Sequence, residues 1–418
     1  MYGRNNSPAI ELSTLRLTRL RVVALAGLFL AVALGVSFQQ YGGAKDLVLP
    51  SGGFVGGDFL AFYTAASAAR DGDAARTYEP EFFEAKLHEF GPPKDRFGLT
   101  WQYPPTYFLI VAPFALLAYA PAYVLWVVAT GAAWLATLRL AGLRDAFVFV
   151  VVACPPAFHA VITGQNGFLT AALLAIAALF ADRRPVVAGL AAALLTVKPQ
   201  LGVLLPIAYI AAGCWRAFAV AAAGALLLAA ASFWAFGAET WRAMLDGFAS
   251  TSDNLAAGLL PLYKMMTPFA AARLAGLPTA AAAGVHIAFA SAAIVFVALV
   301  WRRVRDAELR AAALLASVFF VAPYGYYYEA IILAVPAALV ARRGLATGWL
   351  RYEQLALVAA FILPLMTPGE PRRIGVAYGF FVSAWIFALV ARRIAHEHPD
   401  VLSIARRRNA SSASGGTA

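Results

Sequence analysis

An acidic residue follows two glycines in the segment GGDF, at Asp58. Because glycine lets the backbone approach a substrate closely, this carboxylate could act as a general base toward a hydroxyl group. Aspartate is also a common N-cap residue, and the following segment FLAFYTAASAAR could form a helix that Asp58 caps. The sequence therefore leaves two roles open for Asp58, a general base and a helix cap.

Other polar and aromatic residues occur in short segments between apolar runs, namely WQYPP, TGQNG, VKPQ and PYGYYYE. Lys198 in VKPQ could neutralise a phosphate, or it could reach toward a membrane interface. Tyr103 could contact a ligand or belong to an interfacial aromatic belt. The phenols around Tyr324, next to Glu329, suit a polyhydroxylated ligand. The histidines and cysteines show no metal-ligand spacing apart from the HEH segment near the C-terminus, so we expect no metal or other cofactor.

The composition indicates which elements must position these residues. Of the 418 residues, 62% are apolar and 13% are charged, whereas a soluble chain has about half apolar and a quarter charged residues. The surplus apolar surface must face lipid, which excludes a cytosolic enzyme, a disordered chain and a secreted disulfide scaffold. In a soluble protein, the net charge of +11 would suggest nucleic-acid binding. In a membrane protein, the positions of the basic residues indicate which side of the membrane each segment faces.

The apolar segments predict an all-α polytopic membrane protein. Three arginines precede the run at 22–38, which predicts a retained signal-anchor helix after a cytoplasmic segment at 1–21. A transmembrane domain is expected over 22–391, with a long outer loop at 39–103 and a second outer region at 237–279, followed by a cytoplasmic polar tail at 392–418. The further apolar segments are 104–119, 121–138, 145–162, 167–181, 185–197, 200–213, 216–236, 280–301, 309–322, 327–341, 352–367 and 374–391.

The positive-inside rule constrains the number of crossings. If every segment crosses, Arg139, Arg144, Arg183 and Arg184 fall outside. If either 104–119 or 121–138 does not cross, these arginines lie inside, as do both termini, and about 12 helices span the membrane. The candidate residues then lie on the outer face. The excess of basic residues is explained by the orientation of the chain in the membrane, and it implies no nucleic-acid partner.

Two of the polar tips are expected at membrane depth. A helix over 185–197 is about 20 Å long, whereas the hydrocarbon core is about 30 Å thick, so Lys198 should lie within it. The same argument applies to Glu329. Because charged groups and non-helical backbone are tolerated there only when paired or lining a cavity, we expect a cleft lined by Lys198, Glu329, Gln165 and Asn166.

The segments GGDFLAFYTAA, YPP, TGQN, LLTVKPQLG and PYGYYYE occur in this order over about residues 50–340. Together they resemble glycosyltransferase family 87, a group of polyprenyl-phosphate-mannose-dependent mannosyltransferases with a GT-C fold. The resemblance implies an integral membrane enzyme that moves a hexose, typically mannose, from a polyprenyl monophosphate to a lipid or glycan acceptor at the outer face of the cytoplasmic membrane. Family members often carry an acidic or histidine-bearing motif late in the chain, where this sequence has PYGYYYE and no histidine.

The resemblance also implies residue roles. The aspartate of the family's first outer loop, thought to be the catalytic base, corresponds to Asp58. In an inverting transfer Asp58 would accept the proton of the acceptor hydroxyl, and the leaving phosphate would be neutralised by three cations: Lys198, Lys264 and Arg373. The residues expected to bind the sugar or the acceptor are Tyr103, Gln165, Asn166, Tyr324 and Glu329.

A transporter or flippase for a lipid-linked or polar solute is the alternative function. Transporters are commonly built from internal repeats with sites open to both faces. The sequence shows no half-to-half repeat, and its polar residues gather on one side, which favours the transferase.

Overall fold

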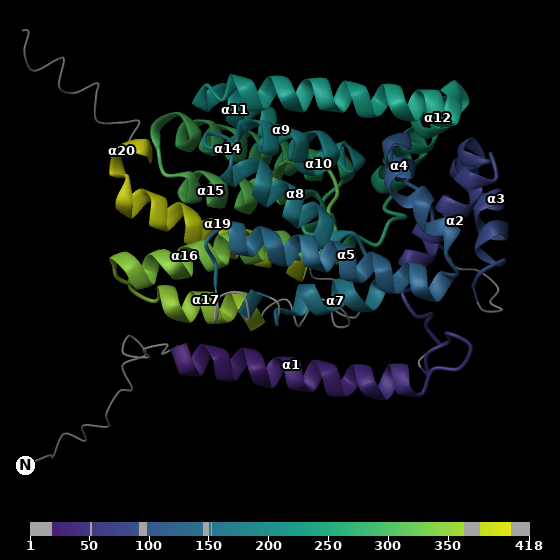
Figure 1. Cartoon of the computed structure of the whole chain (residues 1–418). Helices are drawn as coiled ribbons and strands as arrows, with labels where there is room; N and C mark the ends of the chain where they lie inside the picture. The colour runs from purple at the N-terminus through teal and green to yellow at the C-terminus, as the bar shows by residue number, and fades with distance from the viewer. Residues whose placement is uncertain are drawn as a thin grey trace, which may run out of the picture.

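The computed structural model describes residues 19–50, 52–91, 98–144, 150–151, 153–362 and 377–402. Within these ranges the chain is helical and forms one bundle, with strand-like pairing limited to isolated bridges (Figure 1). The N-terminal helix α1 (Arg19–Gly42) lies along one side of the bundle, and the long helix α12 (Trp215–Ala256) lies along the opposite side.

The remaining α-helices are α2 (Phe59–Arg70), α3 (Pro80–Leu87), α4 (Phe108–Val111), α5 (Tyr119–Leu140), α7 (Pro155–Thr163), α8 (Gly167–Leu179), α9 (Pro185–Leu194), α10 (Pro199–Gly202), α11 (Leu204–Ala212), α13 (Pro268–Leu274), α14 (Thr279–Arg303), α15 (Ala307–Val321), α16 (Ala334–Thr347), α17 (Glu353–Ile362), α19 (Tyr378–Glu397) and α20 (Pro399–Leu402). Short 3₁₀ turns are η2 (Ala74–Tyr78), η3 (Pro105–Tyr107), η4 (Ala112–Leu116), η5 (Leu195–Val197), η6 (Leu262–Lys264) and η7 (Tyr327–Leu333).

Several helices can cross a membrane, as expected for a multi-pass membrane protein. Among the described residues, five helical stretches have the length and composition for a span: α5, α12, α14, the continuous stretch Tyr327–Thr347 and α19. Six shorter apolar helices, such as Gly167–Leu179 and Pro185–Val197, accompany them. The expected count of about 12 crossings therefore stays a prediction.

The structure distinguishes the two segments between which hydropathy could not choose. Residues 105–116 break into η3, α4 and η4, with Pro113 within η4. By contrast, α5 is a continuous helix of 22 residues. Of these two segments, only α5 has the length and composition of a membrane span, whereas Pro105–Leu116 is a shorter apolar stretch.

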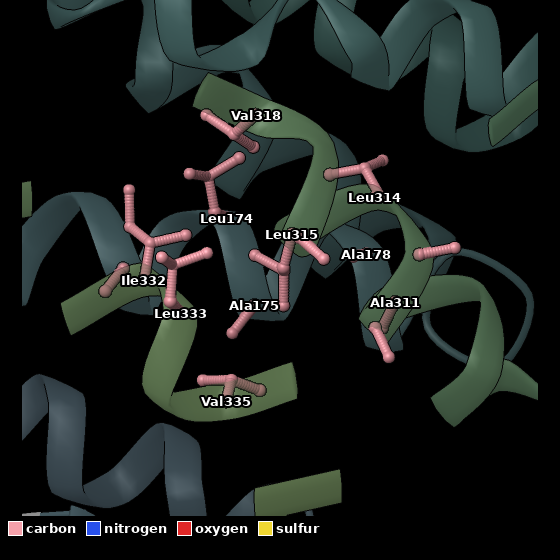
Figure 2. Close-up of a cluster of buried hydrophobic side chains, with 14 of the residues drawn as sticks. Leu174, Ala175, Ala178, Ala311, Leu314, Leu315, Val318, Ile332, Leu333 and Val335 are labelled. Carbon is pink, nitrogen blue, oxygen red and sulfur yellow. The ribbon is translucent and has the colours of Figure 1, made fainter. Parts of the chain in front are cut away.

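The centre of the bundle is formed by α8 and α15, whose side chains are almost all buried. Both helices are rich in alanine, and small side chains let neighbouring helices approach closely. Figure 2 shows Leu174 and Ala178 of α8 beside Leu314 and Val318 of α15. The residues that precede α8 and those that follow α15 are thereby fixed relative to one another.

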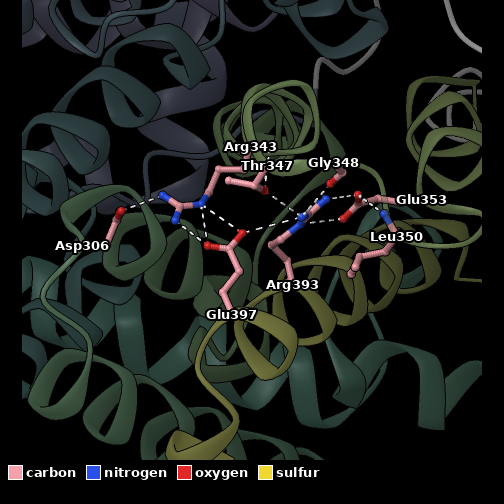
Figure 3. A network of polar contacts seen from close by, with 8 residues as sticks. All are labelled: Asp306, Arg343, Thr347, Gly348, Leu350, Glu353, Arg393 and Glu397. Carbon is pink, nitrogen blue, oxygen red and sulfur yellow. Dashed lines mark hydrogen bonds and ion pairs between the residues drawn. The ribbon is translucent and has the colours of Figure 1, made fainter.

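An ion-pair network joins four helices at the end of the bundle where α16 and α19 finish (Figure 3). Arg343 of α16 binds Asp306, which precedes α15, and Glu397 of α19. Arg393 of α19 is 1% exposed and pairs with Glu353, the first residue of α17. The helix α19 therefore continues past the boundary expected at residue 391, because Arg393 and Glu397 are part of this network.

Both regions expected to be polar contain helices. The first loop holds α2, η2 and α3, and α2 is buried along most of its length. The second region, expected at 237–279, begins inside α12, which continues to Ala256 across a break at Gly237 (φ 80°, ψ 165°). The apolar part of α12 is mostly exposed, as suits a helix that faces lipid.

Candidate active site

The GGDF and TGQN segments are held together by their backbones. The amide of Asp58 donates to the carbonyl of Thr163 over 3.1 Å, and the indole of Trp126 donates to the carbonyl of Gly164 over 2.8 Å. Gly164 has a φ of +66°, and a Cβ built on it would lie 2.6 Å from Cβ of Phe59. The turn therefore requires glycine at this position, and it places Gln165 beside Asp58.

Asp58 stands at the N-cap position of α2, but its side chain makes no capping hydrogen bond. The partly buried carboxylate instead has a hydrogen bond with the side chain of Gln165. The side chain of Asp58 therefore does not cap the helix, and Gln165 orients its carboxylate.

Lys198 and Glu329 form a buried ion pair. The Nζ of Lys198 lies 2.7 Å from Oε1 of Glu329 and donates to Oδ1 of Asn166 over 2.9 Å. Only 6% of the lysine side chain and 2% of the glutamate side chain are exposed. Lys198 is therefore paired inside the protein and does not extend to its surface.

Asn166 connects this ion pair to two tyrosines. Its Nδ2 donates to the hydroxyls of Tyr103 and Tyr107, each over 3.2 Å. Nζ of Lys198 lies 5.4 Å from the ring centre of Tyr103 and 5.0 Å from that of Tyr328. The lysine thus meets one carboxylate, one amide and two aromatic faces.

The PYGYYYE segment is held by its own backbone and by the segment that follows η6. Oε2 of Glu329 accepts from the amide of Tyr326 over 3.0 Å, and the amide of Met266 donates to the carbonyl of Gly325 over 2.8 Å. Gly167 allows the start of α8 to approach, because a Cβ there would lie 2.6 Å from the carbonyl oxygen of Tyr328. Lys264, two residues before Met266, is thereby carried to the site.

Burial raises the pKa of the Asp58 carboxyl above its ordinary value. The hydrogen bond with Gln165 and the positive charges of Lys264 and Lys198 act in the opposite direction and favour the carboxylate. The carboxyl is therefore a stronger base than an exposed aspartate and is still held by groups that stabilise its charged form.

The structure brings together eight of the residues singled out in the sequence: Asp58, Tyr103, Gln165, Asn166, Lys198, Lys264, Tyr324 and Glu329. Tyr324 is near enough to Lys198 and Glu329 for their charges to act on its hydroxyl. The ninth, Arg373, lies outside the described residues. In the part of the chain that the structure describes, no group of three or more His, Cys, Asp or Glu residues could hold a metal ion.

Two residues of the cluster were not singled out in the sequence. Tyr107 binds Asn166, and its spacing of one helical turn from Tyr103 in YPPTY was a signal that could have found it. His159 packs its ring against Tyr327, with 4.6 Å between centroids, and lies near Lys264. It precedes Thr163 by one turn of α7, so its position before TGQN was the available signal.

Comparison with known proteins gives one family match. The model of glycosyltransferase family 87 matches residues 101–323. The matched range contains Tyr103, TGQN, Lys198 and Lys264, and it begins after Asp58 and ends before Glu329. No curated protein and no solved structure matches the chain.

Proposed function

Because the chain belongs to glycosyltransferase family 87 and is a membrane glycosyltransferase, we propose that it transfers a hexose, with mannose as first choice, from a polyprenyl phosphate. The acceptor is a lipid or glycan at the outer face of the cytoplasmic membrane, and both termini are cytoplasmic. The proposal depends mainly on one observation. The carboxylate of Asp58 does not cap a helix, and it lies in one cluster with the cations Lys198 and Lys264.

Asp58 serves as the general base. The acceptor hydroxyl gives its proton to the Asp58 carboxylate while its oxygen bonds to the anomeric carbon. The bond between that carbon and the phosphate oxygen breaks, and the polyprenyl phosphate leaves with the electron pair. Attack from the face opposite the phosphate inverts the configuration of the sugar.

Lys264 and Lys198 stabilise the leaving phosphate. Lys264 is half-buried and acts electrostatically on Asp58, so a phosphate bound beside it would lie near the base. Lys198 is already paired with Glu329, and it contributes the second positive charge within the site. Fixed cations aimed at a developing negative charge are an effective form of transition-state stabilisation. Arg373 is a third candidate for this role.

The polar groups around the base bind hydroxyls of the sugar or the acceptor. Oε1 of Gln165 is buried and has no hydrogen-bond partner within the described ranges, so it can accept from a substrate hydroxyl. Asn166, Tyr103, Tyr324 and Glu329 complete this set, and the start of α8 at Asn166 adds favourable potential for an anion. These contacts support the proposal for a polyhydroxylated substrate.

The test is a transfer assay with a defined donor. Membranes that contain the overexpressed protein are incubated with radiolabelled polyprenyl-phosphate mannose, and the label is followed into lipid and polymer fractions. We expect label to be incorporated only when the protein is present. When synthesis of the polyprenyl-phosphate carrier is blocked, we expect no incorporation from a nucleotide-linked mannose. Incorporation from the nucleotide sugar alone would contradict the donor assignment, and movement of the intact carrier without transfer would favour a transporter.

A further inference from the structure

An apolar cavity of about 530 Å³ lies between α1 and the helical bundle. Its walls come from α1, α7, α16, α17 and α19, and Figure 1 shows α1 alongside the bundle on the side of α7 and α17. Ring contact between Phe29 and Phe361, with 5.9 Å between centroids, joins α1 to α17. The volume falls within the range of about 300–1,000 Å³ that is typical of ligand pockets.

Small side chains on α16 create the space. Ala334, Ala337, Ala338 and Ala341 line the cavity at helical spacing, and larger apolar residues of the other helices close it. Such a wall suits a flexible hydrocarbon chain, because it offers contact along its length and no hydrogen-bonding groups.

Positive charge is confined to one end of the cavity. Arg342, in the C-terminal half of α16, and the exposed Arg144 line it there, and no Asp or Glu is among its described lining residues. Arg342 is positioned by a 3.0 Å hydrogen bond to the carbonyl of Ala141 and by an ion pair with Glu308. A ligand that matches this cavity has an apolar chain and an anionic head at the arginine end.

We propose that this cavity binds an acyl chain of an anionic phospholipid whose phosphate group lies against Arg144 and Arg342. The arginine end is the end of α16 remote from Glu329, and the helical rise from Glu329 to Arg342 places it about 20 Å from the catalytic cluster. A phosphate bound there cannot be the leaving group of the transfer. The lipid is therefore a resident lipid of the leaflet on the arginine side, separate from the donor and the acceptor.

The proposal is tested by native mass spectrometry of the full chain in mild detergent. The probes are dioleoyl phosphatidylglycerol and dioleoyl phosphatidylcholine, which share their acyl chains and differ in net charge. We expect the protein to retain one phosphatidylglycerol in preference to phosphatidylcholine. Arg144→Gln should weaken phosphatidylglycerol binding by about fivefold and leave phosphatidylcholine binding unchanged, because one interfacial cation is lost.

Two further variants test the location. Ala341→Trp fills the cavity and should abolish retention, whereas Leu226→Trp, at a position on α12 that is 71% exposed, should retain the lipid as the wild-type protein does. Both variants should keep transferase activity, because neither residue belongs to the catalytic cluster. Equal binding of the two lipids by the wild-type protein, or unchanged retention in Ala341→Trp, would overturn the proposal. Displacement of phosphatidylglycerol by a lower concentration of polyprenyl phosphate would assign the cavity to the carrier instead.

Discussion

At the residue scale, the ion pair between Lys198 and Glu329 determines how the site is held. Moving an ion out of water costs several kcal/mol, and the cost is recovered only when the partner and the remaining hydrogen bonds are in place. Here Glu329 meets Lys198 and the amide of Tyr326, and Lys198 also meets Asn166. Each member of the pair therefore depends on the other.

Removal of one partner should destabilise the protein more than removal of both. We expect Glu329→Gln to lower the free energy of unfolding by about 3–5 kcal/mol, because the ammonium of Lys198 stays buried without a counter-charge. The double variant Lys198→Met/Glu329→Leu should recover most of that loss while transfer activity stays absent. Thermal unfolding of the detergent-purified proteins measures the difference. If the double variant unfolds at a temperature no higher than that of Glu329→Gln, the ion pair does not control stability.

The pKa of Asp58 gives a prediction on pH dependence. Lys264 lowers this pKa, so replacing it with methionine raises the pKa further. Since only the carboxylate accepts a proton, the acidic limb of kcat/KM should move to higher pH in Lys264→Met. Lys86→Met is the control, because Lys86 pairs with Asp71 and Glu89 and does not act on Asp58. A shift to lower pH, or an equal shift in the control, would contradict the assignment of Asp58 as the base.

At the element scale, the turn between α7 and α8 joins the base to the cation. It binds Asp58 through the carbonyl of Thr163, and it presents Gln165 and Asn166 on either side of the cluster. Its left-handed residue, Gly164, is packed against Phe59. The geometry of the site therefore depends on the backbone of this turn as much as on the side chains.

Gly164→Ala should disturb the site through the backbone. The new methyl group would lie 2.6 Å from Cβ of Phe59, and alanine at φ +66° is strained. We expect a loss of about 1–3 kcal/mol of stability and a larger relative loss of transfer activity. Gly284→Ala in α14 is the matched control, because its Cβ would meet no atom within 4 Å and φ there is helical. Equal effects of the two variants would argue against a special role for the turn.

The sequence predicted the order of these elements, and eight of the residues that it singled out lie in one cluster. The sequence predicted that charges at the tips of short apolar hairpins are paired or line a cavity, and Lys198 and Glu329 are paired and buried. Periodicity could not reveal that Gly237 interrupts one long helix, or that Arg393 near the C-terminus is buried against Glu353. The pair of Arg393 with Glu353 and the hydrogen bond from Asn166 to Tyr107 depend on contacts between residues distant in sequence. The break at Gly237 is a local backbone conformation with a positive φ, which glycine tolerates.

At the scale of the whole molecule, the two ends of the bundle differ in chemistry. The candidate site contains Lys198 and Lys264, whereas the other end has arginines in the last turn of α14, at Arg343 of α16 and at Arg393 of α19. Of these arginines, Arg343 is paired with Glu397 and Arg393 with Glu353. If arginines mark the cytoplasmic side, as the sequence predicts, the site faces outward, and this orientation stays a prediction.

Labelling of single cysteines tests this orientation. In a background with Cys154 and Cys214 replaced by alanine, we introduce Glu81→Cys in α3 or Arg183→Cys in the turn after α8. A membrane-impermeant maleimide should modify the Glu81→Cys protein in intact cells, whereas the Arg183→Cys protein should react only after permeabilisation. Both substituted positions are exposed, so accessibility within the protein does not separate them. The opposite pattern would place the site on the cytoplasmic side.

The central claim is that Asp58 accepts the proton of the acceptor, and Asp58→Asn tests it most directly. Because the side chain does not cap α2, asparagine can occupy its place without loss of a helix cap. General-base catalysis contributes about 10²–10⁴-fold, so we expect kcat to fall by at least about 100-fold while thermal unfolding and donor binding stay unchanged. Glu81→Gln, an exposed carboxylate in the same loop, should keep full activity. Transfer by purified Asp58→Asn at the wild-type rate would contradict the claim.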